Sequence, residues 1–215
     1  FITPSNAELD ITNAAKVKEF IEREKPDFVI NFAAYTNVNE AEKQKGKKDE
    51  VCYRVNVEGV RNILDAIDPQ KTHFIQISTD YVFSGSEADP GPYTEDHPTE
   101  TDPNKLTWYG YTKAEAERLV LERLESKATI LRIIYPVRKE YEKKLDYLRK
   151  SLKQYKEGNL PPLFTDQQIS ITFIDEACKA LAKIISQKHK GIFHAGSSNT
   201  TTPYELITFI IEKVS

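Results

Sequence analysis

The sequence predicts an α/β fold in which helices cover both faces of a doubly wound parallel sheet. Three observations predict it. Short apolar runs such as residues 28–32 alternate along the chain with amphipathic helical stretches such as residues 14–24. The runs are apolar at nearly every position, as in parallel strands that are buried on both faces. Right-handed crossovers between such strands then place helices on both faces, and ligands bind at the carboxyl ends of the strands.

The first half of the chain supplies its elements in a regular order. Asp10-Ile11-Thr12-Asn13 offers N-cap candidates for a helix over residues 14–24, which Pro26 stops. Residues 28–32 form the first strand. A helix over residues 49–67 and a buried strand over residues 73–77 follow. Residues 85–104, rich in Pro, Gly, Asp and Thr, are expected to form a long loop, and loops of that length are usually functional or disordered.

The second half repeats the alternation. We expect helices over residues 109–125, 140–157, 174–187 and 203–214, and strands over residues 128–134 and 191–195. Pro203 stands at a favoured first position of the last helix. The strands at 28–32, 74–77 and 128–132 are expected to lie in the centre of the sheet.

Composition limits the function classes. Hydrophobic residues make up 39% of the chain, enough to bury a core, and the formal net charge of -3 comes from mixed charges. We therefore expect neither nucleic acid nor a membrane as partner, and no apolar run approaches the ~20 residues that span a bilayer. Cys52 and Cys178 make no disulfide framework, which favours a reducing, cytoplasmic location. The four histidines lack metal-ligand spacing, so no metal site is expected.

The chain begins at Phe1 and contains 0 methionines. We therefore expect the chain to be incomplete, and selenomethionine residues omitted from the sequence would explain the missing methionines. Short motifs consequently carry more weight here than long spacings.

Small and polar residues follow two of the predicted strands. Ala33 and Ala34 would let a ligand approach the backbone closely, although alone they fit ordinary helix packing better. Ser78-Thr79-Asp80 follows the strand at residues 73–77, where a hydroxyl can donate to a substrate carbonyl. The alternative is an ordinary turn, because Ser, Thr and Asp favour turns.

Tyr109 and Lys113 are four residues apart on a predicted helix and therefore share one face. A nearby ammonium favours the phenolate, so we expect Lys113 to lower the pKa of Tyr109 toward neutrality and make it a usable general acid or base. Any lysine-rich helix produces this spacing by chance, so an exposed surface pair is the alternative.

In combination, these motifs resemble the extended short-chain dehydrogenase/reductases and, more narrowly, the dTDP-4-dehydrorhamnose reductase family. The shared motifs lie at residues 8–12, 26–31, 33–38, 55–56, 78–83, 92–96 and 109–113. The resemblance implies a Rossmann-like NAD(P)-binding fold. It makes residues 1–135 a dinucleotide-binding domain and residues 136–215 a mixed region, with a small C-terminal substrate lobe plus a strand and helix that return to the sheet.

The resemblance also implies residue roles. Thr79 would hydrogen-bond a sugar carbonyl, Tyr109 would protonate the developing alkoxide, and Lys113 would hold the nicotinamide ribose. Asn56 would support the Tyr109–Lys113 pair through water. The residues expected to bind the cofactor, NADPH or NADH, are Asp10, Ile11, Ala33, Ala34, Tyr35, Asn56, Tyr109 and Lys113. Those expected to border a nucleotide-sugar substrate are Thr36, Val38, Asp80 and Tyr81.

Two departures from the family pattern bear on substrate and cofactor. The glycine-rich first turn that cradles a pyrophosphate is absent, which we attribute to truncation or missing order. The resemblance also implies a chain that continues beyond residues 203–214, so we expect the sequence to be incomplete at both ends. Residues 133–138, Ile-Ile-Tyr-Pro-Val-Arg, replace the family's Thr-Ser-Trp-Val-Tyr-Gly run, so the exact sugar stays open. The choice between NADH and NADPH and the presence of a homodimer stay open as well.

Three functions follow as hypotheses. The first is NAD(P)H-dependent reduction of a 4-keto group on a nucleotide-linked deoxysugar, as in dTDP-rhamnose biosynthesis. The second is a nucleotide-sugar epimerase or dehydratase, although a dehydratase would typically have two acidic residues after the active-site Thr, where Asp80-Tyr81 stands here. The third is a non-catalytic, dinucleotide-binding regulator such as the regulatory subunit of methionine adenosyltransferase.

Overall fold

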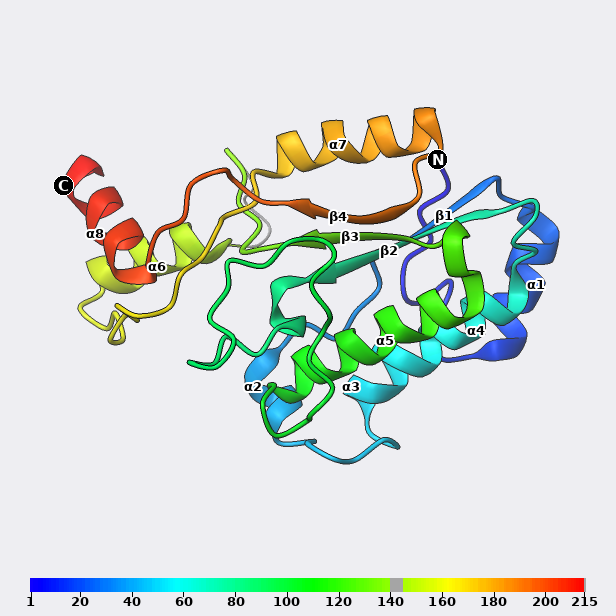
Figure 1. Cartoon of the computed structure of the whole chain (residues 1–215), viewed down its shortest axis with the longest axis horizontal. Coiled ribbons are helices and arrows are strands. Elements are labelled where there is room, and N and C mark those ends of the chain that lie inside the picture. Colours follow the sequence, from blue (N-terminus) through cyan, green and yellow to red (C-terminus); the bar gives the residue numbers. More distant parts are fainter. Residues whose placement is uncertain (140–144, 215) are drawn as a thin grey trace. The chain divides into compact units, whose positions relative to one another are not determined.

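The computed structural model describes residues 1–139 and 145–214 (Figure 1). Within them one sheet has the strand order β1-β2-β3-β4. Its strands are β1 (Phe28–Asn31), β2 (His73–Thr79), β3 (Thr129–Ile133) and β4 (Gly191–Ala195). Strands β1 and β2 pair in parallel, with Phe28 opposite His73 and Asn31 opposite Gln76. The predicted α/β fold is confirmed.

The helices that alternate with these strands are α1 (Ala14–Glu24), α2 (Val38–Glu42), α3 (Val51–Tyr53), α4 (Gly59–Ala66), α5 (Trp108–Leu124), α6 (Tyr147–Lys156), α7 (Ile174–Gln187) and α8 (Pro203–Val214). Of these helices, α1, α5, α7 and α8 begin and end close to the predicted positions, whereas α2 was not predicted. Three tighter or wider turns join them: the π-helical turn η1 (Arg54–Glu58) and the 3-10 turns η2 (Asp80–Val82) and η3 (Glu125–Lys127).

Three helix predictions need comment. Helix α1 begins as predicted, since the Asn13 side chain accepts a hydrogen bond from Lys16 N at 3.1 Å. The helix predicted over residues 49–67 is wrong as a continuous α-helix, because η1 widens one turn between α3 and α4. Helix α6 starts only at Tyr147, after the N-cap Asp146, and part of the predicted helix, residues 140–144, lies outside the described residues.

The position of β1 corrects another prediction. In the strand order, β1 lies at one end of the sheet rather than in its centre. Its first three residues are half-buried, and Phe32, expected to be its last residue, is 63% exposed. Strands β2 and β3 are buried over most of their length, as predicted for central strands.

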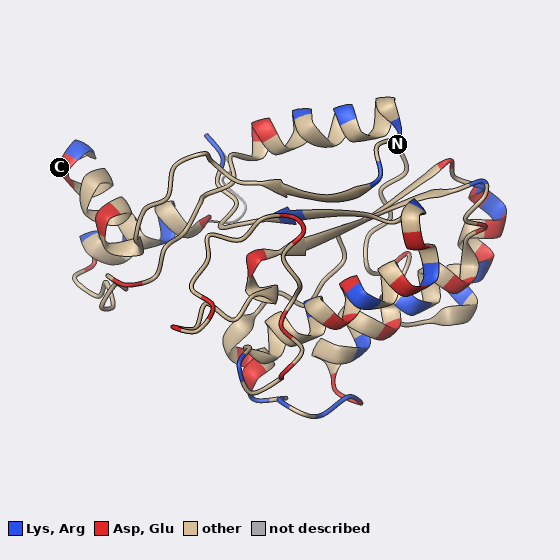
Figure 2. Ribbon diagram, viewed as in Figure 1, with Lys and Arg blue, Asp and Glu red and all other residues tan. Residues whose placement is uncertain are grey.

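The main hydrophobic core lies between the sheet and the helices α1, α4 and α5. Apolar residues at helical spacing on α4, such as Val60 and Ile63, meet Val120 of α5 and Phe74 of β2. All four are at most 5% exposed, and each such side chain contributes roughly 1.5–3 kcal/mol when fully buried. Charged residues of both signs alternate along the outer sides of α1, α4 and α5 (Figure 2). The apolar contacts of this core hold α5 against β2.

The chain divides into two compact units. The first contains Phe1–Arg132 and Ile185–Phe193, and the second contains Ile133–Ile184 and His194–Ser215. The second unit has its own small cluster around Val137, Ile169 and Ile171. The assignment of a dinucleotide domain to residues 1–135 and a substrate lobe to the remainder stays a prediction. Among the described residues, no helix combines the length and the apolar character that a membrane span requires.

Candidate functional site

Thr79 ends β2 at the carboxyl edge of the sheet. It is 6% exposed and caps the turn η2, so its hydroxyl accepts a hydrogen bond from Tyr81 N at 3.4 Å. The same hydroxyl donates to Asp80 Oδ1 at 3.0 Å. Burial raises the pKa of the Asp80 carboxyl to about 6, and the hydrogen bond from Thr79 opposes that rise. A strand end and a tight turn therefore place a hydroxyl beside a carboxyl that titrates near neutrality.

Two side-chain caps fix the start of α5, the helix that carries Tyr109. The hydroxyl of Thr107 accepts from Gly110 N at 3.1 Å, as expected of an N-cap residue. Glu42 reaches over from α2, and its Oε2 accepts from Trp108 N at 2.7 Å. A carboxylate at a helix N-terminus is favoured by the helix dipole. Sequence reasoning missed Glu42, because its partner lies 66 residues further along the chain.

A glycine lets α5 approach the turn η2. A Cβ atom on Gly110 would lie only 2.2 Å from the carbonyl oxygen of Tyr81, so any side chain there would collide with the backbone. This close approach brings the Tyr81 and Tyr109 rings edge to face, with centroids 5.6 Å apart. It also places the Tyr109 side chain beside Thr79, close enough for Thr79 to influence the pKa of the phenol. The two side chains expected to act on one carbonyl oxygen are therefore neighbours.

The predicted lowering of the Tyr109 pKa is wrong for this structure. Burial raises the pKa of Tyr109 to about 12; the neighbouring Thr79 side chain opposes the rise, and the negative charges that Asp80 and Cys52 carry when ionised add to it. Lys113 does not counteract the rise, because its ammonium is directed elsewhere: Nζ donates to the carbonyl oxygen of Ile77 at 2.7 Å.

Lys113 is a buried cation, only 3% exposed, beside the C-terminal end of strand β2. Burial lowers the pKa of Lys113 to about 8, and the charge of Glu117 opposes that shift. One N–H of its ammonium donates to the Ile77 carbonyl oxygen, so two N–H groups can donate to a ligand. The hydroxyl of Ser78, 3% exposed, has no hydrogen-bond partner among the described residues. These donors fit the hydroxyl and amide groups of a nicotinamide nucleoside.

Asn56 lies in the π-helical turn η1 and is 1% exposed. Its Oδ1 accepts from Tyr35 N at 2.7 Å, and its Nδ2 donates to Tyr35 O at 3.2 Å and to Thr112 Oγ1 at 2.9 Å. Thr112 in turn donates to Tyr109 O at 2.8 Å. Asn56 thus ties the segment after β1 to α5 through Thr112, next to Lys113.

The remaining predicted cofactor residues occupy two places. Ala33 is exposed and Ala34 half-buried directly after β1, in the segment that Asn56 holds. Asp10 is exposed, and its Oδ1 accepts from Thr12 N at 2.9 Å and Thr12 Oγ1 at 2.8 Å. The side chain of Ile11 is only 8% exposed and belongs to the main core.

The predicted substrate residues also occupy two places. Thr36 is exposed and Val38 half-buried where α2 begins. Asp80 and Tyr81 form the turn η2 after β2. The structure therefore brings Thr79, Asp80, Tyr81 and Tyr109 together.

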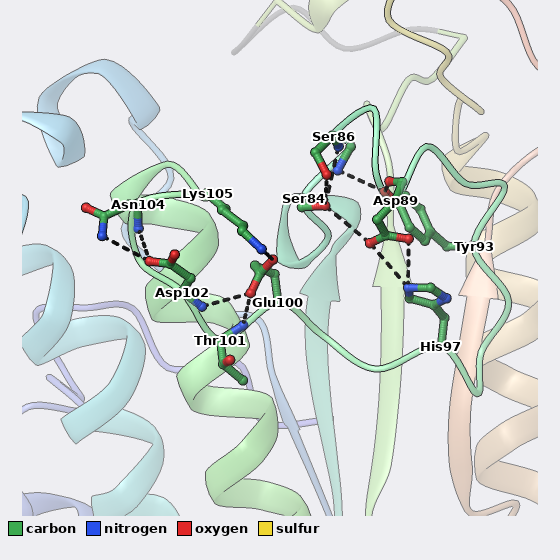
Figure 3. A network of polar contacts seen from close by, with 11 residues as sticks. Ser84, Ser86, Asp89, Tyr93, His97, Glu100, Thr101, Asp102, Asn104 and Lys105 are labelled. Atoms are coloured by element: carbon green, nitrogen blue, oxygen red, sulfur yellow. Dashed lines mark hydrogen bonds and ion pairs between the residues drawn. The ribbon is translucent and has the colours of Figure 1, made fainter.

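The long loop after β2 is held by the polar contacts drawn in Figure 3. Asp89 accepts from Ser84 Oγ at 3.2 Å and lies 3.2 Å from His97 Nε2. The Tyr93 ring stacks on Phe83, with centroids 4.1 Å apart. A separate group forms around Glu100, whose Oε1 accepts from two backbone N–H groups. Among the described residues no cluster of His, Cys, Asp and Glu could hold a metal ion.

Comparison with known proteins places the chain in a family. Residues 1–215 match the model of the RmlD substrate binding domain family. A dTDP-4-dehydrorhamnose reductase of Streptomyces griseus is 41% identical over 124 residues, which cover 58% of this chain and 38% of that protein. Methionine adenosyltransferase 2 subunit beta of Xenopus tropicalis is 30% identical over 207 residues, 92% of this chain and 58% of that protein. The matched regions thus span less than two thirds of either relative.

A solved structure is similar over nearly the whole chain. The dTDP-4-dehydrorhamnose reductase of Bacillus anthracis in complex with NADP has a TM-score of 0.81 and 26% identity, over 98% of this chain and 70% of that one. The Rossmann-like fold implied by the sequence is thereby confirmed. On the evidence of its motifs, its fold and the match over its full length, the chain belongs to the RmlD substrate binding domain family.

Proposed function

We propose that this protein reduces the 4-keto group of a nucleotide-linked deoxysugar with NADPH, as dTDP-4-dehydrorhamnose reductase does in dTDP-rhamnose biosynthesis. The observation that carries the proposal is that the Thr79 and Tyr109 side chains lie beside each other at the carboxyl end of β2, one helical turn from the buried ammonium of Lys113. Carboxyl ends of parallel strands are where open α/β sheets bind ligands. The Bacillus anthracis relative was solved with NADP, which favours NADPH over NADH.

In this proposal Tyr109 is the general acid. NADPH supplies the hydride, and the protein supplies orientation and a proton. With a pKa of about 12, the phenol of Tyr109 is fully protonated at neutral pH, so its proton is available to the carbonyl oxygen as negative charge develops there. The Thr79 hydroxyl, beside it, orients the same oxygen. Aligned donors of this kind stabilise developing charge without reorganisation.

The cofactor contacts are assigned in the same way. Lys113 offers two N–H groups to the nicotinamide ribose from a buried position. Ala33, Ala34 and Tyr35 follow β1 and would lie along the dinucleotide, with Asp10 and Ile11 near the adenine. Asn56 has its amide bonded to Tyr35 and Thr112, so we assign it a positioning role. Thr36, Val38, Asp80 and Tyr81 would border the sugar.

The substitution Tyr109→Phe tests the proposal. It keeps the ring but removes the proton, so kcat for reduction of dTDP-4-dehydrorhamnose should fall ~10²–10⁴-fold while NADPH binding stays nearly intact. The matched control is Tyr111→Phe, which removes a hydroxyl from the same helix and should leave kcat unchanged. Lys113→Ala should weaken both turnover and NADPH binding. Equal turnover of Tyr109→Phe and the unaltered protein would refute the assignment.

A second function has a specific observation in its favour. The similarity to methionine adenosyltransferase 2 subunit beta extends over 92% of this chain at 30% identity. A chain that binds dinucleotide and regulates a partner enzyme would use the same cofactor residues. It would bind NADPH but would not oxidise it with any 4-keto nucleotide sugar, whether or not Tyr109 is present. A steady-state NADPH oxidation assay separates the two functions.

We also propose the expected setting of the protein: a cytoplasmic location, a nucleotide-sugar substrate, no nucleic-acid partner, and a homodimer as a candidate assembly. The two cysteines are free, Cys52 buried and Cys178 exposed, which suits a reducing compartment. The net charge of -3 supports the expectation that nucleic acid is not bound. Light scattering of the purified protein would measure its oligomeric state.

A further inference from the structure

Four lysines surround an open pocket at the edge of the sheet opposite the candidate site. The pocket has a volume of about 470 Å³, and its lining includes Lys71, Lys127, Lys188 and Lys190. Phe28 and His73, the first residues of β1 and β2, also line it. Thr79 lies at the other end of β2, so this pocket is separate from the dinucleotide and sugar contacts proposed above.

The fold gathers these lysines from distant parts of the sequence. Lys71 precedes β2, Lys127 ends η3 before β3, and Lys188 and Lys190 precede β4. The three strands are neighbours in the sheet, and the turns that enter them meet at one edge. All the lining residues belong to the first compact unit.

The positive charges in the pocket are balanced only in part by the protein's carboxylates. Lys71 pairs with Asp68 at 3.0 Å. Lys127, Lys188 and Lys190 form no ion pair among residues 1–139 and 145–214. Asp27 is the carboxylate that lines the pocket. Four lysines therefore outnumber the two nearby carboxylates, and a bound anion would reduce the repulsion between the lysines.

The pKa of His73 depends on the positive charge of the pocket lysines. Its ring stacks on Phe28 with centroids 5.3 Å apart, and its Nε2 lies 2.7 Å from Thr129 Oγ1. Burial lowers the pKa of His73, and the positive charges of Lys190 and Lys188 lower it further. An anion between these two lysines would screen them, so it would raise the pKa of His73.

We propose that this pocket is a second ligand site, which binds a small multivalent phosphate group through Lys127, Lys188 and Lys190. Phosphate is the class of ligand that point-charge ammonium groups recognise without bidentate geometry. The pocket is open, as a charged ligand that keeps part of its hydration requires. The proposal does not depend on the reductase activity, since the site lies at the opposite edge of the sheet.

The experiment follows His73 by NMR while sodium tripolyphosphate is added to the intact protein at low salt. Tripolyphosphate should bind and raise the pKa of His73, whereas citrate, a carboxylate anion of similar charge, should bind more weakly. Lys188→Glu combined with Lys190→Glu should weaken tripolyphosphate binding at least about tenfold, because two attractions become repulsions. The control Lys18→Glu makes the same kind of charge change on α1 and should leave the affinity within about twofold.

Three results would overturn the proposal. One is saturating tripolyphosphate that leaves the His73 pKa unchanged. Another is an affinity loss in Lys18→Glu as large as in the double variant, which would mean unspecific attraction. The third is equal binding of citrate. If the double variant fails to fold, Lys127→Gln, which removes one charge from the same pocket, should still reduce the affinity, and unchanged affinity would refute the site.

Discussion

Gly110→Ala offers a direct test of how the candidate site is assembled. The new Cβ would lie 2.2 Å from the carbonyl oxygen of Tyr81 and 3.1 Å from its carbonyl carbon. Both are backbone atoms, so no side-chain rotation relieves the clash. An ordinary contact begins near 3.4 Å, so α5 and the turn η2 must separate by about 1.2 Å. That shift would pull Tyr109 away from Thr79.

The magnitude follows from this displacement. A misplacement of about 1 Å in an active site can cost 10²-fold in rate, so we expect kcat to fall roughly 100-fold. Alanine favours a helix over glycine by about 1 kcal/mol, which offsets part of the ~1–3 kcal/mol that overpacking costs. The variant should therefore stay folded, with a modest loss in the free energy of unfolding measured by urea denaturation.

The matched comparison is Gly59→Ala on α4. There the new Cβ would meet side-chain atoms of Ile11, with Cδ1 at 2.5 Å and Cγ1 at 2.7 Å, and no backbone atom, so the clash does not separate α5 from η2. This variant should lose stability at comparable cost but keep its kcat. If Gly110→Ala keeps full kcat, or if both variants lose it equally, the close approach of α5 to η2 does not position the reacting groups.

Three further changes test single contacts. Arg132 Nη2 lies 2.6 Å from Glu117 Oε2, and both side chains are 1% exposed, so Glu117→Leu leaves a buried guanidinium without its carboxylate. Urea denaturation should show a loss of about 3–5 kcal/mol in the free energy of unfolding, and a loss below about 1 kcal/mol would contradict this. Asp80 has a folded-state pKa of about 6, above its ordinary value, so the free energy of unfolding should fall as the pH rises from about 4 to about 6. Asp80→Asn should lack this decline, and parallel stability curves for the variant and the unaltered protein would contradict the raised pKa. Asn56→Ala leaves Tyr35 N without its acceptor, so thermal unfolding should show a loss of about 1–3 kcal/mol in the free energy of unfolding. Fluorescence titration should show weaker NADPH binding, and an unchanged stability and affinity would contradict the positioning role of Asn56.

The order of strands and helices could be predicted from the sequence because it depends on local periodicity. The spacing of Val17, Phe20 and Ile21 predicts α1, and the apolar run before Ser78 predicts β2. The motifs around Thr79 and Tyr109 likewise named the residues of the candidate site, since their types and spacing are properties of short segments. The π-helical turn around Asn56 escaped prediction, because a helical pattern does not record one wide turn.

The burial, the neighbours and the pKa values of those residues were decided by the tertiary structure alone. The Tyr109–Lys113 spacing predicted a lowered tyrosine pKa, but burial of both groups and the bond from Lys113 to Ile77 produce a raised one. Burial depends on what packs around a residue. Tyr109 meets Thr79 across 29 intervening positions only because Gly110 admits the backbone of η2. Likewise, the lysines at 127, 188 and 190 share a pocket only because the turns before neighbouring strands meet at one edge of the sheet. Local sequence therefore determined the elements and the reactive groups, whereas long-range packing decided their neighbours, their charge states and the second pocket.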